Sequence, residues 1–151
     1  MRAWLLSLGT ILLGAVLAWA AGPMPDSFAV HFADPVVVSN SLTLQPGNYR
    51  FKRITRPTDP AVFTIMNADS GKVIGNTPTA ILNPNGPGPS SAGSVNTVEK
   101  GYLLIDQYDG KSYLDTVYLQ GMGHGFMFNQ PSEARSQGHQ VRVPIDTGGQ
   151  D

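Results

Sequence analysis

Beyond residue 21, the chain contains no stretch of more than ten residues with the periodicity of an amphipathic helix. Short segments instead alternate between apolar and polar residues, and turns containing glycine or proline separate them. The 151 residues include 17 glycines and 12 prolines, so turns recur at short intervals. This pattern predicts an all-β fold, either a small antiparallel β-sandwich or a partly open barrel of about seven to nine short strands.

The clearest local signal is a hairpin centred on Asp109-Gly110. Alternating runs at 101–108 and 112–119 flank this pair, and Asp-Gly between such runs is typical of a two-residue turn. Strict alternation along the second arm predicts two faces, with Tyr113, Asp115, Val117 and Leu119 on one and Leu114, Thr116 and Tyr118 on the other.

The chain is expected to form one domain, which fits its length. Only one short C-terminal helical turn is expected, at 132–136 with Ser132 as its N-cap. The expected organisation is a signal peptide at 1–20, a lead segment at 21–27, a β-sandwich domain at 28–130 with a flexible Gly/Pro loop at 83–94, and a C-terminal segment with a polar tail at 131–151.

The first twenty residues have the pattern of a secretory signal peptide. Arg2 precedes an apolar run that ends at Ala21, and Ala18-Trp19-Ala20 places small residues where a signal peptidase cleaves. A retained N-terminal anchor is the alternative, because the apolar run is close to the length of about 20 residues that spans a bilayer. The predicted location is the periplasm or the extracellular space, and no second run of spanning length follows.

Composition excludes several classes of function. The chain has no cysteine, which rules out disulfides, thiolate metal sites, iron–sulfur clusters and a cysteine nucleophile. A disulfide-free exported protein is more typical of bacteria than of small secreted eukaryotic domains. The net charge of −1 provides no field for nucleic acid or for an anionic membrane.

No catalytic or metal-binding motif is visible. The three histidines, His31, His124 and His139, lie beside no Gly-x-Ser-x-Gly elbow and at no metal-ligand spacing. Asp106 and Asp109 lack the alternating spacing of a calcium loop, and Asp115 lies on the returning arm of the hairpin. We therefore expect no catalytic residue, metal or cofactor, although an enzyme whose site is assembled from distant residues stays an alternative.

Two features are candidates for ligand binding. The glycines around His124 would let a ligand approach the backbone closely. The tyrosines of the hairpin would offer rings that stack on the apolar faces of sugars, and ordinary cross-strand pairing is the competing interpretation. The candidate site residues are His124, Tyr102, Tyr108, Tyr113 and Tyr118.

A basic cluster at Arg50, Lys52, Arg53 and Arg56 has two interpretations. It would suit an anionic polymer or a lipid headgroup, or it would protect an edge strand from pairing with neighbouring molecules. The edge strand is the preferred interpretation.

Residues 44–51, Leu-Gln-Pro-Gly-Asn-Tyr-Arg-Phe, resemble a turn and strand found in a loosely defined group of small exported bacterial β-domains. The resemblance continues through the turn at 65–72 and through the Tyr-Asp-Gly hairpin and glycine-rich step at 108–128, whereas the insertion at 83–94 departs from the compact form. That group has no assigned activity, so the resemblance implies a fold and a compartment.

The predicted function is therefore that of an exported, non-enzymatic β-domain that acts as an interaction or structural module in the cell envelope or outside the cell. A module that binds carbohydrate or another surface ligand is the alternative. The expected partners are an envelope or extracellular protein, or a polysaccharide.

Overall fold

The computed structural model describes residues 26–54, 61–82 and 98–147, which form ten strands and one short helix. The predicted all-β class with at most one short helical turn is confirmed. The predicted signal peptide, the loop at 83–94, Arg56 and nearly all of the polar tail lie outside the described residues. The elements are β1 (Ser27–Phe32), β2 (Val36–Ser39), β3 (Leu42–Leu44), β4 (Gly47–Arg53), β5 (Val62–Asn67), β6 (Val73–Leu82), β7 (Tyr102–Tyr108), β8 (Lys111–Tyr118), β9 (Gly125–Phe128), α1 (Ser132–Gln137) and β10 (His139–Pro144).

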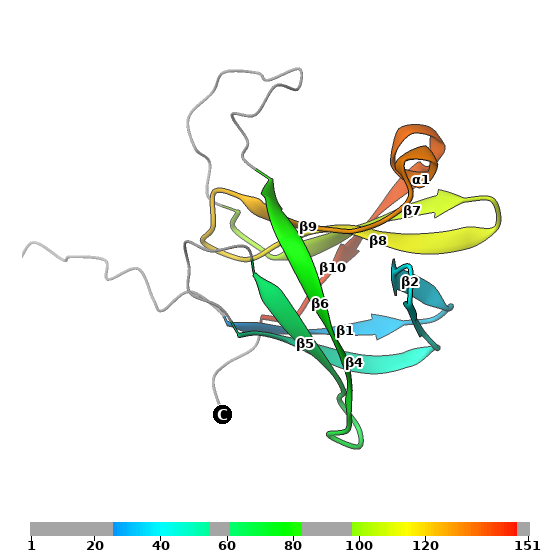
Figure 1. Ribbon diagram of the computed structural model, residues 1–151. Coiled ribbons are helices and arrows are strands. Elements are labelled where there is room, and N and C mark those ends of the chain that lie inside the picture. Colours follow the sequence, from blue (N-terminus) through cyan, green and yellow to red (C-terminus); the bar gives the residue numbers. More distant parts are fainter. Residues whose placement is uncertain (1–25, 55–60, 83–97, 148–151) are drawn as a thin grey trace, which may run out of the picture.

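The strands form one sheet in the order β1-β4-β5-β6-β9-β8-β2-β3, and β7 joins β8 to β10. All pairs are antiparallel except β2 with β8. In Figure 1, β7, β8 and β9 form an upper layer above β1 and β4, and the long strand β6 crosses from one layer to the other. The sheet therefore curls around its own inner face.

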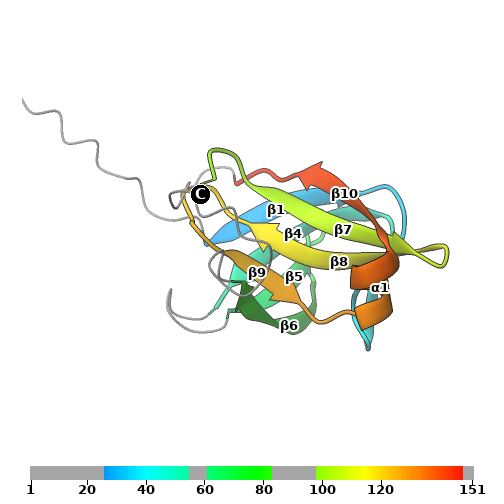
Figure 2. The same cartoon turned by 90° about the horizontal axis from the view of Figure 1, so that it is seen from above.

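The first strand meets the segment that follows the last strand. Beyond β10, the backbone of Asp146 exchanges two hydrogen bonds with Ala29 of β1, at 2.7 and 3.0 Å. Figure 2 shows β10 running near β1 on the same side of the molecule. This single bridge ties together an otherwise open sheet, and it builds the C-terminal segment into the same structure.

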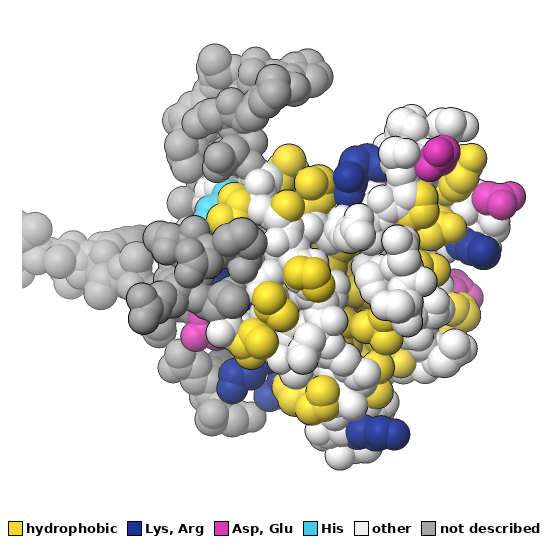
Figure 3. Space-filling view, in the orientation of Figure 1, with side chains coloured by type: hydrophobic (Ala, Val, Ile, Leu, Met, Phe, Trp, Pro, Cys, Tyr) yellow, Lys and Arg dark blue, Asp and Glu magenta, His cyan; other side chains and the backbone are white. Residues whose placement is uncertain are grey.

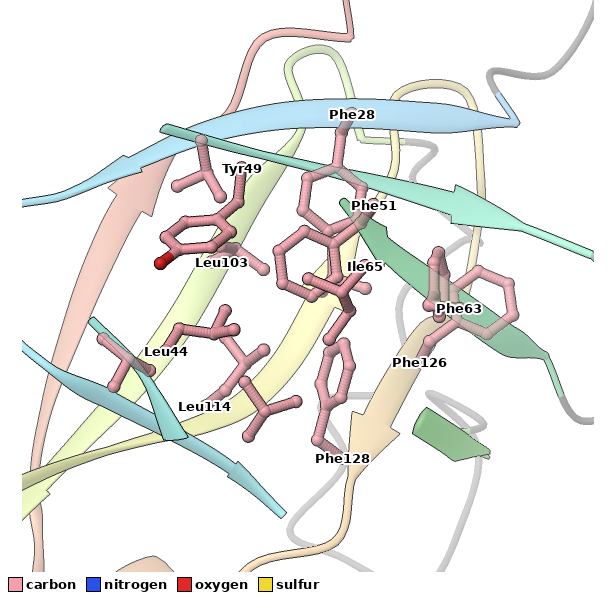
Figure 4. Close-up of a cluster of buried hydrophobic side chains, with 14 of the residues drawn as sticks. Phe28, Leu44, Tyr49, Phe51, Phe63, Ile65, Leu103, Leu114, Phe126 and Phe128 are labelled. Atoms are coloured by element: carbon pink, nitrogen blue, oxygen red, sulfur yellow. The ribbon is translucent and has the colours of Figure 1, made fainter. Parts of the chain in front are cut away.

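The inner face of the sheet is filled with phenylalanine. The rings of Phe28 and Phe51 stack with centroids 4.8 Å apart, and Phe63 packs edge-on against Phe126 at 5.6 Å. Figure 4 shows side chains from strands of both layers converging on this cluster. Because the described residues pack the interior with side chains, a ligand would have to bind outside the core.

Strand β4 shows how the sequence specifies the inner face. Tyr49, Phe51 and Arg53 are buried, and the residues between them are exposed, as period-two alternation requires. β4 pairs with both β1 and β5. The interpretation of its basic residues as protection of an edge strand is therefore wrong, because both edges of β4 are already paired.

The hairpin at Asp109-Gly110 is confirmed, with φ of 50° and 68° at the two turn residues. Its predicted faces are wrong along β8. Ile105 pairs with Leu114 and Leu104 with Thr116, so Asp115 is an extra residue in a β-bulge. Beyond the bulge the alternation shifts by one residue, and Val117 is buried on the same side as Leu114.

Helix α1 has six residues, and within the described part of the chain no helix is long and apolar enough to cross a bilayer. Its predicted N-cap is wrong, since Pro131 occupies the N-cap position without a side-chain hydrogen bond. Ser132 instead lies in the first turn, and its hydroxyl bonds the carboxylate of Glu133.

Candidate functional site

A groove of about 840 Å³ lies beside the β7–β8 turn. One wall is the hairpin tip, residues 107–112, and the other is formed by the chain that follows β1 together with β2 and β3. His139, the first residue of β10, completes it. In Figure 3, acidic and basic side chains gather at the right edge of the molecule, where the hairpin tip lies.

The lining of the groove combines a tyrosine ring with several kinds of hydrogen-bonding side chain. Tyr108 supplies the ring, Asp34 and Asp109 supply carboxylates, and Lys111 supplies an ammonium group. An amide, a hydroxyl and an imidazole come from Gln107, Ser112 and His139. Such a surface can hydrogen-bond a molecule rich in hydroxyl groups, and its ring can cover an apolar face of that molecule.

The predicted site residues do not form one site. Tyr108 lines the groove. Tyr102 and Tyr118 lie at the other end of the hairpin, where they are direct cross-strand partners with stacked rings 4.9 Å apart. Arg142 lies over the Tyr102 ring at 3.6 Å from its centroid. The interpretation of these two tyrosines as a cross-strand pair is therefore confirmed.

Burial raises the pKa of Tyr118, and the nearby Tyr102 and Asp115 raise it further. The neutral phenol is thus favoured at this end of the hairpin. Tyr113 is half-buried near the middle of β8, opposite Asp106.

His124 lies apart from all four tyrosines in the chain between β8 and β9. Its ring meets Phe126 edge-on at 5.1 Å, and its Nε2 atom is buried with no hydrogen-bond partner among the described residues. Burial lowers the pKa of His124, and the positive charge of Arg53 lowers it further. His124 therefore favours its neutral form and belongs to the surroundings of a buried arginine.

A second polar site lies on the same hairpin, beneath helix α1, and it is not among the sites predicted from the sequence. Asp106 of β7 and Asp115 of β8 are both buried. The amide Nε2 of Gln130 donates to both, at 2.6 Å to Asp106 Oδ2 and 2.8 Å to Asp115 Oδ1. We call Asp106, Asp115, Gln130, Arg135 and Gln140 the carboxylate cluster.

Further contacts of the two carboxylates come from Arg135 and Gln140, which belong to the cluster, and from the neighbouring Thr116. Arg135 Nε pairs with Asp115 Oδ1 at 2.9 Å, and Thr116 Oγ1 donates to Asp115 Oδ2 at 3.1 Å. Gln140 Nε2 donates to Asp106 Oδ1 at 3.2 Å. The cluster thus links the hairpin, α1 and β10 through charge-assisted hydrogen bonds.

The sequence does contain one signal for the carboxylate cluster. The Asp109-Gly110 turn folds β7 back onto β8, so that Asp106 and Asp115 return to the same region of the hairpin. The bulge then lets the side chain of Asp115 reach the same amide as that of Asp106. Asp34 and His139 of the groove carry no comparable signal, because they are 105 residues apart (139 − 34).

Comparisons of the chain with protein-family models, with curated proteins and with solved structures find no match.

Proposed function

We propose that this chain is an exported binding domain whose groove at the β7–β8 turn takes a hydroxyl-rich ligand, with an envelope or extracellular polysaccharide as the favoured class. One observation carries the proposal: a groove of about 840 Å³ presents a tyrosine ring, two carboxylates, an amide and an imidazole together. Planar rings and carboxylates are the groups that recognise sugars, by stacking and by accepting hydrogen bonds from hydroxyls.

The position of the groove supports the proposal. It lies outside the phenylalanine core and is open to solvent, so a polymer can enter and leave it without unfolding the domain. The hairpin that forms it has a two-residue turn, and the hydrogen bonds of the carboxylate cluster join its strands behind the groove, which limits the ordering that binding would require.

Contact with an envelope protein is the second candidate. Val73, Ile74 and Leu82 of β6 are large exposed apolar residues along one strand. Figure 3 shows apolar side chains over the region where β6 crosses the molecule. Exposed apolar residues along a strand can contribute to a protein-binding surface.

Titration calorimetry with fragments of envelope polysaccharides tests the groove. Tyr108→Ala should weaken binding at least about tenfold, and Asp34→Asn should weaken it as well. Tyr102→Ala and Glu133→Gln are the matched controls, since they remove a ring and a charge outside the groove. Loss of binding in Tyr102→Ala alone would move the ligand to the stacked tyrosines. Unchanged binding in both groove variants would rule the groove out.

The export proposal is tested by the mass of the protein recovered from its own host. A species that begins at Ala21 in the soluble envelope fraction or the medium supports cleavage and export. An intact N-terminus in the membrane fraction favours the retained anchor, and recovery of the intact chain from the cytoplasm contradicts export.

A further inference from the structure

Two strand edges face each other where β1 approaches β10. β1 pairs with β4 alone and β10 with β7 alone, so within the described residues each keeps a free edge apart from the Ala29–Asp146 bridge. In Figure 1, the two strands part from this bridge toward the side of the hairpin tip. We call the opening between them the seam. A fully closed barrel would have no such edges.

The hydrogen-bond alternation of β10 identifies the backbone groups that face the seam. The N–H of Ile145 donates to the carbonyl of Gly101 at 3.3 Å, so every second residue counted back from Ile145 bonds to β7. The residues between them, Gln140, Arg142 and Pro144, direct their backbone groups into the seam. On that side the backbones of Gln140 and Arg142 have no partner among the described residues. A strand edge of this kind can pair with a further strand.

Pro144 explains why β1 does not pair with this edge itself. The register of the Ala29–Asp146 bridge, continued by two residues, would place His31 opposite Pro144. Proline has no backbone N–H, so the carbonyl of His31 would find no donor in that pair. The described residues accordingly form a single bridge here, and both edges stay unpaired beyond it.

A pocket of about 390 Å³, which we call the seam pocket, lies at the bridged end of the seam between His31, Pro144 and Asp146. Asn48 Nδ2 donates to the carboxylate of Asp69 at 3.1 Å, because a carboxylate only accepts. Asn48 Oδ1 therefore faces His31 Nδ1 at 2.8 Å and accepts a hydrogen bond from it. The Nε2 atom of the neutral ring is then an acceptor. Such a pocket suits an ammonium or guanidinium group, which only donates.

Carboxylates line both ends of the seam. The groove beside the hairpin tip lies at the open end, since it is bounded by the chain after β1 and by the first residue of β10. Asp34 and Asp109 line the groove, and Asp69 and Asp146 line the seam pocket. Lys111 is the one lysine or arginine among the described residues that line either of them. This charge favours a cationic partner over an acidic one.

We propose that the seam binds an extended, basic segment of another protein, which adds a strand antiparallel to the free edge of β10. Residues directly opposite each other in paired strands point their side chains to the same face of the sheet. A lysine or arginine opposite Pro144 therefore lies over the seam pocket and donates to its acceptors. The alternate residues of the segment are apolar, because they face inward on the same side as Val143, which packs against the core. Backbone hydrogen bonds supply the affinity and the seam pocket selects the side chain.

Fluorescence anisotropy with the labelled peptide Lys-Val-Lys-Val-Lys-Val tests the pairing. With its lysines opposite Gln140, Arg142 and Pro144, the lysine amides point at β10 and the valine amides point away. N-methylation of the lysine amides should weaken binding at least about tenfold, and N-methylation of the valine amides should change it less than about threefold. The two modified peptides share one composition and one charge, so they are matched controls. Replacing the lysines by glutamates should abolish binding.

A variant of β10 tests the same hydrogen bonds from the side of the protein. Arg142→Pro removes an N–H that faces the seam, whereas the bonds from β10 to β7 run through Val141 and Val143 and stay intact. It should weaken binding of the unmodified peptide at least about tenfold. Arg142→Ala is the matched control, because it also removes the guanidinium that lies over Tyr102 but keeps the N–H. Should Arg142→Pro fail to fold, the N-methylated peptides decide the question with the unaltered protein.

Five outcomes would overturn the proposal. The unmodified peptide does not bind at about 1 mM, the two N-methylated peptides bind equally well, or Arg142→Pro binds as Arg142→Ala does. Loss of peptide binding in Tyr108→Ala would place the peptide in the groove. Self-association of the protein that Arg142→Pro abolishes would show that a second copy of the chain occupies the edge. The inference does not rest on the sugar proposed for the groove, because Tyr108→Ala should weaken sugar binding and leave peptide binding unchanged.

Discussion

Two ion pairs in the molecule differ in which partner is buried, the cation or the acid. In the Arg53–Asp26 pair the cation is buried and the acid is exposed, with side chains 3% and 68% accessible and a distance of 3.0 Å. In the Arg135–Asp115 pair the acid is the buried member, with side chains 38% and 9% accessible and a distance of 2.9 Å. Each pair therefore leaves one charge inside the protein and one at its surface.

The two buried charges have different surroundings. Arg53 contacts the sulfur of Met122 at 4.0 Å and lies 5.6 Å from the centre of the Phe126 ring, and within the described part of the chain its Nε has no hydrogen-bond partner. Asp115 accepts hydrogen bonds from neutral side chains as well as from Arg135. A buried guanidinium can be stabilised by soft apolar neighbours, whereas a buried carboxylate needs donors. The stability of the fold should therefore depend more on the partners of the buried Asp115 than on those of the buried Arg53.

The largest expected effect follows from removing the shared donor. Gln130→Leu should lower the free energy of unfolding by about 3 kcal/mol, because both buried carboxylates lose a hydrogen bond at once. Arg53→Met should cost less than about 1 kcal/mol, since an apolar side chain of similar length replaces the buried member of an ion pair and Asp26 returns to water. Denaturant unfolding at neutral pH measures both.

Gln120→Leu is the matched control for Gln130→Leu, because Gln120 is an exposed glutamine. Its cost should be within about 0.5 kcal/mol. A greater loss of stability in Arg53→Met than in Gln130→Leu would show that the fold depends more on the buried arginine than on the donor shared by the two buried carboxylates.

A smaller effect is expected from moving the backbone behind the carboxylate cluster. Gly138 joins α1 to β10, and a Cβ atom there would collide with the carbonyl oxygen of Ala134 and lie 3.1 Å from Asp106 Cβ. Gly138→Ala should therefore push α1 from β7 at a cost of about 1–3 kcal/mol. Gly75→Ala is the control, because its Cβ would meet only Leu42 at an ordinary 3.5 Å. Equal stability of the two variants in denaturant would show that close packing of α1 beside Asp106 does not contribute to the stability of the fold.

The parts of the fold that local chemistry dictates were predictable from the sequence. Asp109-Gly110 predicts the central hairpin because few residue pairs adopt positive φ at both turn positions. Alternation in β4 places Tyr49 and Phe51 in the core. The interior position of β4 in the sheet was not predictable in the same way, because which strands flank it depends on pairing between distant segments.

The sites were harder to predict, for physical reasons. The bulge at Asp115 shifts every later residue of β8 by one position, and strict alternation cannot reveal a single unpaired residue. The partners of Asp106 and Asp115 come from Gln130 and Gln140, which approach only after α1 and β10 have packed. Of the five predicted tyrosine and histidine residues, only Tyr108 lines the groove, because the others belong to cross-strand pairs or to the surroundings of Arg53.

The smallest predicted effect is a pH dependence of stability that comes from His124, near the buried Arg53. Burial, and then the charge of Arg53, lowers the pKa of His124 below its ordinary value of 6.5. The unfolded chain therefore binds a proton more readily than the folded chain does, so this group's contribution to stability is complete above about pH 6.5. That contribution is lost as the pH falls through the lowered pKa of the folded state. Unfolding midpoints measured between neutral pH and about pH 5 should decline, in part through this group.

Three variants isolate the contribution of His124. His124→Gln cannot titrate and should flatten the pH dependence, whereas His31→Gln removes an exposed histidine and should leave it unchanged. Arg53→Met should reduce the slope only in part, because burial is the larger cause of the shift and remains in that variant. If His124→Gln does not alter the dependence of stability on pH, the loss of stability in acid comes from other groups. The carboxylate cluster would then be the first place to look for them.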